Sequence, residues 1–286
     1  MRDELDDLIR ERAPWLFHPA AWMRPLRALL FRLLSYDRTV AIAEALAPLP
    51  PEQIMDRMAG LIAHRVDLEG LDRLPKDGPV MILANHPTGI ADGIILWAIL
   101  RQKRPDLFFF ANRDVLRLLP QMDRIIAPVE WRADRRSHAS NRETLLYAKR
   151  AFGAGRAGVI FPSGRLAKRR GLRLHERDWM TSAAMMARKM DVPVVPLRIT
   201  ARNSVLFYLF DWLHPSLRDI TLFHEVLNKG RQPFRLRAGS AIDGRHLPAD
   251  ARDATARLFQ QVERLGGERA GSAGQSPLKT FAPARS

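Results

Sequence analysis

The chain has 286 residues, of which 47% are hydrophobic and 27% are charged. This composition is ordinary for a protein that buries a sizeable core, and it excludes a disordered or collagen-like chain. Cysteine is absent, which excludes disulfides, Cys-ligated metals and thiol nucleophiles. Lys and Arg number 46 against 31 Asp and Glu, so the net charge is +15. The expected partner is therefore an anion: nucleic acid, an acidic membrane face or a phosphorylated substrate.

Neither a signal peptide nor a membrane-spanning helix is expected. The residues after Met1 are too acidic for a signal peptide. A spanning helix needs about 18 or more consecutive apolar residues, and the best candidates, 93–100 and 205–213, are far shorter. The prediction is a protein that is soluble or lies on the cytoplasmic face of a membrane as a peripheral protein.

Residues 1–65 are expected to form a separate helical segment. The stretch 15–34 mixes Trp, Phe and Leu with three Arg and has no acid. Such a mixture suits a helix in the headgroup layer, with its Arg side chains near lipid phosphates. It also suits a helix packed on the core, and both readings remain open. Two further helices are predicted over 37–47 and 51–66.

From residue 66 onward, short runs rich in Val, Ile and Phe alternate with helical stretches. Strands are predicted over 80–84, 107–111, 124–127, 158–161, 193–199 and 234–238. Helices are predicted near 93–101, 113–120, 141–153, 178–190 and 250–265. The alternation indicates an α/β domain over 66–266, with a mostly parallel central sheet flanked by helices. Residues 267–286 are rich in Gly, Ser, Ala and Pro and predict a disordered tail.

The first candidate site is a strand that runs into Asn85 and His86. Pro87 favours an extended conformation at His86 and so places it at the carboxyl end of the strand, where doubly wound sheets bind ligands. Asp92 follows after a turn that contains Gly89. A His and an Asp at such an edge can act as a general base and its orienting partner. The alternative is that Asp92 only caps the next helix and that His86 bonds backbone.

The second candidate site is a strand that ends in a Pro/Gly turn and leads directly into cations. Across 165–177, six cations accompany a single acid, Glu176. A Gly turn at the carboxyl end of a strand, with cations beside it, can cradle a phosphate; a solvated basic loop is the alternative. The turn and its first cations are Phe161, Pro162, Ser163, Gly164, Arg165 and Lys168.

In this order, the segments resemble the glycerolipid acyltransferase family, which contains the lysophosphatidic acid acyltransferases. Its first block is Asn-His, a short loop and Asp; residues 85–92 match the Asn-His-Pro-x-Gly-x-x-Asp form found in the hemolysin branch. Its third block is Phe-Pro-Glu-Gly-Thr-Arg, matched by 161–165. Its fourth block is a Val-Pro-Val-Val-Pro strand, matched by 192–196. The resemblance covers residues 66–245.

The sequence also departs from the pattern of the family. Five residues, where the family usually has four, separate the first block's His from its Asp. In the third block Ser163 stands where the family has an acid, so that carboxylate is missing, and Arg165 follows Gly164 without the usual Thr. The candidate second block is 127–132, with Arg132 as the cation that contacts phosphate.

The resemblance implies direct acyl transfer to a lysophospholipid or related lysolipid in phospholipid biosynthesis. His86, oriented by Asp92, would deprotonate the acceptor hydroxyl, and the alkoxide would attack the thioester of acyl-coenzyme A or acyl carrier protein. No metal or cofactor is expected besides that donor. Arg165 and Lys168 would hold the acceptor phosphate. The other block residues expected at the substrate site are Asn85, Thr88, Gly89, Arg132, Phe161, Pro162, Ser163 and Gly164.

The expected partners are therefore an anionic membrane surface, the lysolipid and the acyl donor, without nucleic acid. Two other functions remain open. One is a serine-type lipid hydrolase or thioesterase using Ser163, although the nucleophile elbow has Gly two residues before the Ser, where this chain has Phe161. The other is a nucleic-acid-binding protein, which the charge favours and no recognised motif supports.

Overall fold

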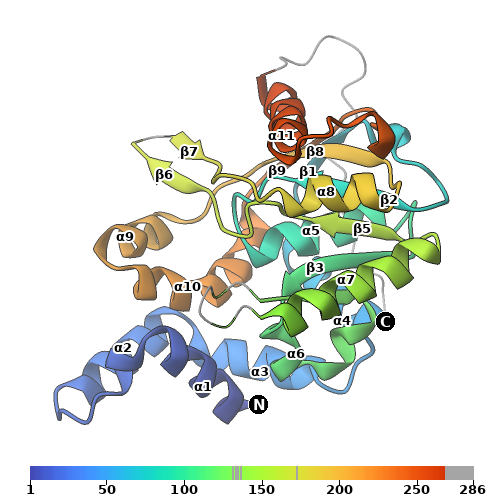
Figure 1. The fold of residues 1–286 in the computed structure, drawn as a ribbon. Coiled ribbons are helices and arrows are strands. Elements are labelled where there is room, and N and C mark those ends of the chain that lie inside the picture. The colour runs from blue at the N-terminus through green and yellow to red at the C-terminus, as the bar shows by residue number, and fades with distance from the viewer. Residues whose placement is uncertain (131, 133–134, 136, 172, 268–286) are drawn as a thin grey trace.

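The computed structural model describes residues 1–130, 132, 135, 137–171 and 173–267. Its central sheet is built from β1 (Val66–Glu69), β2 (Val80–Ala84), β3 (Leu107–Asn112), β4 (Ile126–Val129), β5 (Ala157–Ile160), β8 (Val194–Thr200) and β9 (Phe234–Ala238). The strand order is β1-β9-β8-β2-β5-β3-β4 (Figure 1). Neighbouring strands run parallel, except β8 with β9. The predicted α/β fold with a mostly parallel sheet is confirmed.

Helices cover both faces of this sheet, namely α4 (Pro51–Ile62), α5 (Ile90–Leu100), α7 (His138–Gly153), α8 (Ser182–Lys189) and α11 (Ala251–Gly267). Successive side chains of the central strand β2 point to opposite faces. Val80, Ile82 and Ala84 pack in a core with α4 and α5. Met81 and Leu83 pack in a second core with α7, α8 and α11. Burial on both faces explains why the central strands are continuous apolar runs.

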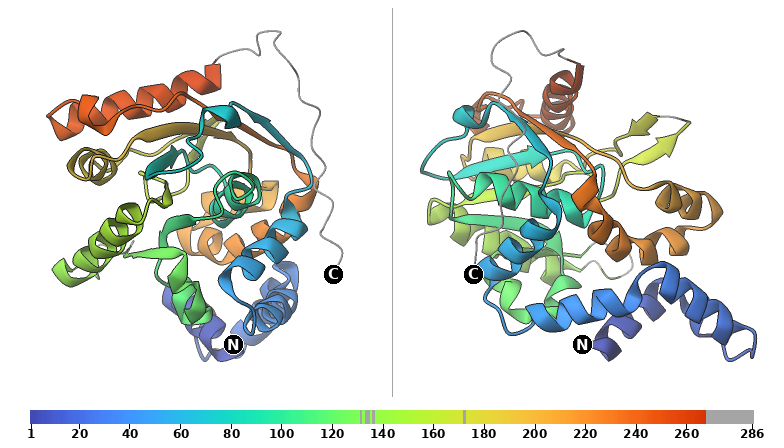
Figure 2. Two further views of the ribbon diagram at one scale, coloured as in Figure 1. Left: turned by 90° about the vertical axis from the view of Figure 1, so that its right-hand side faces the viewer. Right: turned by 180° about the vertical axis from the view of Figure 1, so that it is seen from behind.

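The N-terminal helices pack against a different part of the chain. They are α1 (Arg2–Arg12), α2 (Met23–Leu33) and α3 (Tyr36–Leu46), and their partners are α9 (Val205–Leu213) and α10 (Pro215–Asn228). Leu5 and Leu16 share a third core with Phe210 and Ile220. Figure 2 shows these helices on the side of the molecule opposite α11.

The stretch 15–34 is not one helix, in contrast to the prediction. A short 3-10 turn ends at Phe17, the chain is extended at His18, and α2 begins only at Met23. The residue before a proline avoids the helical conformation, so Pro19 accounts for the break. The Trp and Arg side chains of this stretch are therefore divided between two elements.

Other predicted elements lie close to their expected positions, and some were missed. The strand predicted over 124–127 lies at β4, two residues later. The edge strand β1 was missed because it carries charged residues, and so was the polar hairpin of β6 (Lys168–Arg170) and β7 (Arg173–His175). The tail predicted over 267–286 lies outside the described residues, except for Gly267.

The described part of the chain has neither a membrane span nor a cluster of metal-ligating side chains. None of its helices has both the length and the apolar character needed to cross a membrane. Within the same ranges, no three His, Asp or Glu side chains gather where they could hold a metal ion.

Gly158 in β5 occupies a place where a side chain does not fit. A Cβ there would lie 2.6 Å from Cζ of Phe108 and 2.9 Å from Cζ of Phe152. Overpacking of a core costs about 1–3 kcal/mol. We therefore expect Gly158→Ala to lower the free energy of unfolding by about that amount, as measured by urea denaturation.

Gly153→Ala is the matched control, because nothing lies within 4 Å of a Cβ at that position. It is expected to leave stability unchanged or to raise it, since Ala favours helix over Gly. Equal unfolding midpoints for the two variants would contradict the packing of Phe108 and Phe152 on β5.

Candidate active site

The candidate site forms where β2 and β5 end side by side. The two strands pair in parallel, so their carboxyl ends lie at the same edge of the sheet. His86 follows β2 and Phe161 follows β5 directly. The two rings stack, with centroids 4.1 Å apart and planes inclined by 22°. The first and third sequence blocks are thereby brought into contact.

His86 is hydrogen-bonded to Asp92. The Nδ1 atom of the imidazole lies 3.0 Å from Oδ2 of the carboxylate. The Asp92 side chain is fully buried, whereas 17% of the His86 side chain is exposed. With Nδ1 bound to the carboxylate, Nε2 is the ring nitrogen that can take a proton from a substrate.

Asp92 also caps α5, so it makes both the contact with His86 and the helix cap. The helix begins at Ile90, three residues earlier than predicted, and Asp92 lies in its first turn. Its Oδ2 accepts the backbone N–H groups of Thr88 at 2.9 Å and Gly89 at 3.0 Å. Its Oδ1 accepts the Thr88 hydroxyl at 2.5 Å. Gly89 has φ +87°, a conformation that side-chain-bearing residues rarely adopt.

Asn85 is buried and holds β2 to β8. Its amide nitrogen donates to the carbonyl of Ile199 at 2.9 Å, and its amide oxygen accepts the Ile199 N–H at 2.7 Å. Both groups of the side chain are therefore used within the protein. Contact between Asn85 and a substrate stays a prediction.

The turn after β5 is held by its own hydrogen bonds. The buried Ser163 donates its hydroxyl to the carbonyl of Arg165 at 2.8 Å. Gly164 has φ +58°. Two residues after Arg165, the Ala167 N–H donates to the carbonyl of His86 at 2.9 Å. The Ser163 hydroxyl is thus engaged within its own turn.

The predicted phosphate-binding cations lie in two different environments. Arg165 and Lys168 are exposed, and Lys168 begins the hairpin that leaves the sheet edge. Arg132 instead pairs with Glu11 of α1 at 2.7 Å. Burial by itself would raise the pKa of Glu11, but Arg132 and two neighbouring Arg side chains lower it. The second block is thereby connected to the N-terminal helices.

Glu176 is a site residue that the sequence analysis did not assign. Its Oε2 accepts the backbone N–H of His86 at 3.2 Å, and its Oε1 accepts the indole N–H of Trp179 at 3.3 Å. The Ser163 side chain also lies close enough to this carboxylate to lower its pKa. Burial raises the pKa of Glu176, and these donors oppose the rise. The only sequence signal was a single acid in a basic run.

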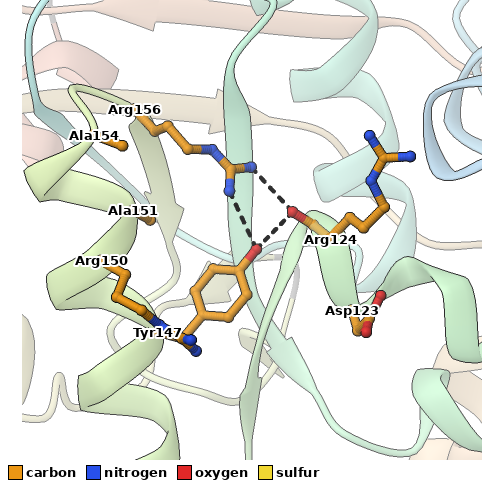
Figure 3. Close-up of a pocket in the computed structure, with 7 residues that line it drawn as sticks. All are labelled: Asp123, Arg124, Tyr147, Arg150, Ala151, Ala154 and Arg156. Atoms are coloured by element: carbon orange, nitrogen blue, oxygen red, sulfur yellow. Dashed lines mark hydrogen bonds between the residues drawn. The ribbon is translucent and has the colours of Figure 1, made fainter.

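A hollow elsewhere on the surface is unrelated to this site (Figure 3). Its lining residues lie near the amino ends of β4 and β5, the opposite edge from His86. The Tyr147 hydroxyl donates to the carbonyl of Arg124 at 2.7 Å, and Arg156 donates to the same carbonyl at 3.2 Å. These polar groups hydrogen-bond to one another and connect α7 to the sheet.

Comparisons with known proteins find similar sequences and a similar fold. Residues 65–200 match the family model described as Acyltransferase. A lyso-glycine lipid O-acyltransferase from Phocaeicola vulgatus is 25% identical over 184 residues, or 62% of this chain and 64% of that protein. Another of the same name, from Bacteroides thetaiotaomicron, is 22% identical over 50% of this chain and 51% of that protein. The matches thus span less than two thirds of either relative.

A solved structure shares the fold. The crystal structure of the 1-acyl-sn-glycerophosphate (LPA) acyltransferase PlsC from Thermotoga maritima superposes with a TM-score of 0.52. It is 16% identical, and the match covers 88% of this chain and 99% of that chain. The shared fold and the family match together indicate an acyltransferase-like domain. The resemblance covers residues 65–200 of this chain, which match the Acyltransferase family model.

The bonds of Asn85 to Ile199 lead to a stability prediction. Asn85→Ala would leave the N–H and C=O of Ile199 buried without these partners. An unsatisfied buried group costs about 1–3 kcal/mol, so the free energy of unfolding is expected to fall by about 2–4 kcal/mol. Asn141→Ala, at an exposed position of α7, is the control. Thermal unfolding of both variants tests this, and similar midpoints would count against the Asn85 bonds.

Proposed function

We propose that this protein is a lipid acyltransferase that moves a fatty acyl group from an acyl thioester to the hydroxyl of a lysolipid. His86 is the general base and Asp92 orients it. The observation that carries the proposal is the bond from His86 Nδ1 to the buried Asp92 carboxylate, at the sheet edge where His86 stacks on Phe161. The names of the relatives support a lysolipid acceptor.

The proposed reaction is a direct transfer. Nε2 of His86 takes the proton of the acceptor hydroxyl, and the oxygen attacks the thioester carbonyl carbon. A C–O bond forms and the C–S bond breaks. The thiolate of coenzyme A or of the carrier protein leaves and receives the proton from the imidazolium, which Asp92 stabilises while it exists. Backbone N–H groups around Gly164 are the candidate donors to the oxyanion. The reaction needs no cofactor besides the acyl donor.

The proposed acceptor is a lysophospholipid or a related lysolipid. Arg165 and Lys168 are exposed beside the turn at Gly164, where they can pair with a phosphate or another anionic headgroup. Thr88 and Gly89 complete the first block beneath the site. We propose that the remaining block residues, including Arg132 and Pro162, also bind the substrate.

The activity is tested by release of free coenzyme A from labelled acyl-coenzyme A. The assay is run without acceptor and with lysophosphatidic acid, a lyso-glycine lipid and a lyso-ornithine lipid. We expect release that depends on an acceptor. We expect His86→Ala to lower it about 10²–10⁴-fold, the usual contribution of general acid–base catalysis, and Ser163→Ala to lower it far less.

Other outcomes point to other enzymes. Release without an acceptor that disappears in Ser163→Ala would identify a thioesterase. Undiminished transfer by the folded His86→Ala variant would contradict the proposed base. Should no lysolipid support release from acyl-coenzyme A, acyl carrier protein is the donor to test next.

We also propose that the protein binds an anionic membrane surface as a peripheral protein. Large apolar side chains are exposed on two helices, among them Trp22 beside α2 and both Val205 and Trp212 on α9. Trp212 is 80% exposed. These helices and the β6–β7 hairpin lie on the same side of the molecule (Figures 1 and 2). Arg169 of the hairpin stacks on Tyr208 of α9 at 4.9 Å. Apolar and basic groups thus adjoin, as at membrane-binding surfaces.

The membrane proposal predicts weaker vesicle binding when α9 loses apolar side chains. Burying one large apolar side chain is worth about 1.5–3 kcal/mol, so Val205→Ser with Trp212→Ser is expected to weaken binding at least about tenfold. Leu146→Ser, at an exposed apolar position on α7, is the matched control. Co-sedimentation with phosphatidylglycerol vesicles measures the effect. Salt-sensitive binding to DNA without binding to vesicles would favour the nucleic-acid function instead.

A further inference from the structure

The carboxylate of Glu176 reaches the main chain of the proposed base from a distant part of the sequence. Glu176 follows the last residue of β7 and accepts the N–H of His86. The bond joins residues 90 positions apart. The indole of Trp179 donates to the other carboxylate oxygen, so both oxygens of Glu176 are engaged. The side chain is therefore held in one orientation, directed at His86.

The residues on either side of the β6–β7 hairpin both hydrogen-bond to the main chain of His86. Ala167, directly before the hairpin, donates its N–H to the carbonyl of His86. Glu176, directly after the hairpin, accepts the N–H of the same residue. Phe161, from the turn that precedes the hairpin, stacks on the ring. The backbone and the ring of His86 are thus both positioned by residues 161–176.

Glu176 also lies beside the position where the third block lacks its acid. The Ser163 side chain lies close enough to the Glu176 carboxylate to lower its pKa. A carboxylate on the side chain of residue 163 would therefore lie close to that of Glu176. The short Ser163 leaves room for a carboxylate that arrives from the far stem of the hairpin.

We propose that Glu176 is a positioning residue for His86 and that it supplies, from the end of the hairpin, the carboxylate that the turn at Ser163 lacks. The proposal rests on the function proposed above, because it assigns Glu176 to the base of that reaction. Glu176 acts through the peptide of His86 and adds a second carboxylate beside the imidazole, on the side of the main chain. Asp92 fixes the ring at Nδ1, and Glu176 fixes the strand end from which the ring projects.

The first test compares Glu176→Ala with Glu176→Gln. Misplacing a catalytic group by about 1 Å can cost about 10²-fold in rate. We expect Glu176→Ala to lower kcat about 10²-fold while KM for the thioester and the lysolipid stays within about threefold, since the loss concerns the chemical step. Glu176→Gln keeps an oxygen that can accept the His86 N–H, so it is expected to retain more activity.

The second test moves the carboxylate. Ser163→Glu combined with Glu176→Ala returns an acid to the third block, and we expect it to recover part of the kcat lost in Glu176→Ala. Glu143→Gln, an exposed carboxylate on α7 that pairs with Arg113, is the control and is expected to keep full activity. Urea denaturation of each variant separates loss of folding from loss of positioning.

A measurement independent of activity decides the case in which no acyl transfer is detected. Because the His86 ring stacks on Phe161, we expect its Cε1–H resonance to be displaced from its ordinary position in the NMR spectrum. We expect Glu176→Ala to move this resonance and Glu143→Gln to leave it in place. A folded Glu176→Ala variant in which this resonance stays in place would overturn the proposal, and where transfer is detected an undiminished kcat would overturn it as well. Loss of transfer in His86→Ala would, in that same case, leave the proposed function standing.

Discussion

The burial of Asp92 is the constraint from which the geometry of the site follows. A carboxylate without exposed surface is costly unless its oxygens accept hydrogen bonds. Thr88 and Gly89 supply donors from the loop, and His86 supplies Nδ1. Because one oxygen accepts the bonds that cap α5 and also contacts the imidazole, the start of the helix and the orientation of the His86 ring are set together. The loop conformation that satisfies the carboxylate also brings two residues six positions apart into contact.

A buried ion pair stabilises the side of the site that α10 forms. Lys229 Nζ lies 3.0 Å from Glu225, and both side chains are essentially inaccessible. Burial lowers the pKa of Lys229, while Glu225 and Asp92 raise it. Glu225 also accepts the N–H of Ser204, just beyond β8. Removing one partner of such a pair costs about 3–5 kcal/mol. The pair therefore acts to hold α10, whose Leu222 lies against Gly89, beside the site.

The hairpin connects the proposed chemistry with the proposed membrane surface. Its exposed cations begin at Lys168, and its Arg169 touches α9, while its two stems hold the peptide of His86. In the function we propose, the segment that meets lipid headgroups is also the segment that positions the base. A lysolipid would approach from the side that carries α2 and α9, and no covalent acyl-enzyme is needed on its path, in keeping with a chain that has no cysteine.

The sequence by itself determined the central strands, and it offered the pairing of His86 with Asp92 as one of two readings. Strands buried on both faces are continuous apolar runs, and the His–Asp contact forms within one short loop, so both signals are local. Even there, only the structure showed that Asp92 caps its helix and orients His86 through the same oxygen. The edge strand β1 gave no such signal, because its residues are only partly buried and include Asp67 and Glu69.

Only the tertiary structure showed the contact of Glu176 with His86 and the exposure of one face of α9. Glu176 meets His86 because the hairpin folds back across 90 positions of sequence, and no local pattern encodes that approach. The apolar run 205–213 looks like any core segment, and the exposure of Trp212 depends on which neighbours pack against α9. Contacts between distant segments depend on how the whole chain packs, whereas burial periodicity and turn chemistry are written in adjacent residues.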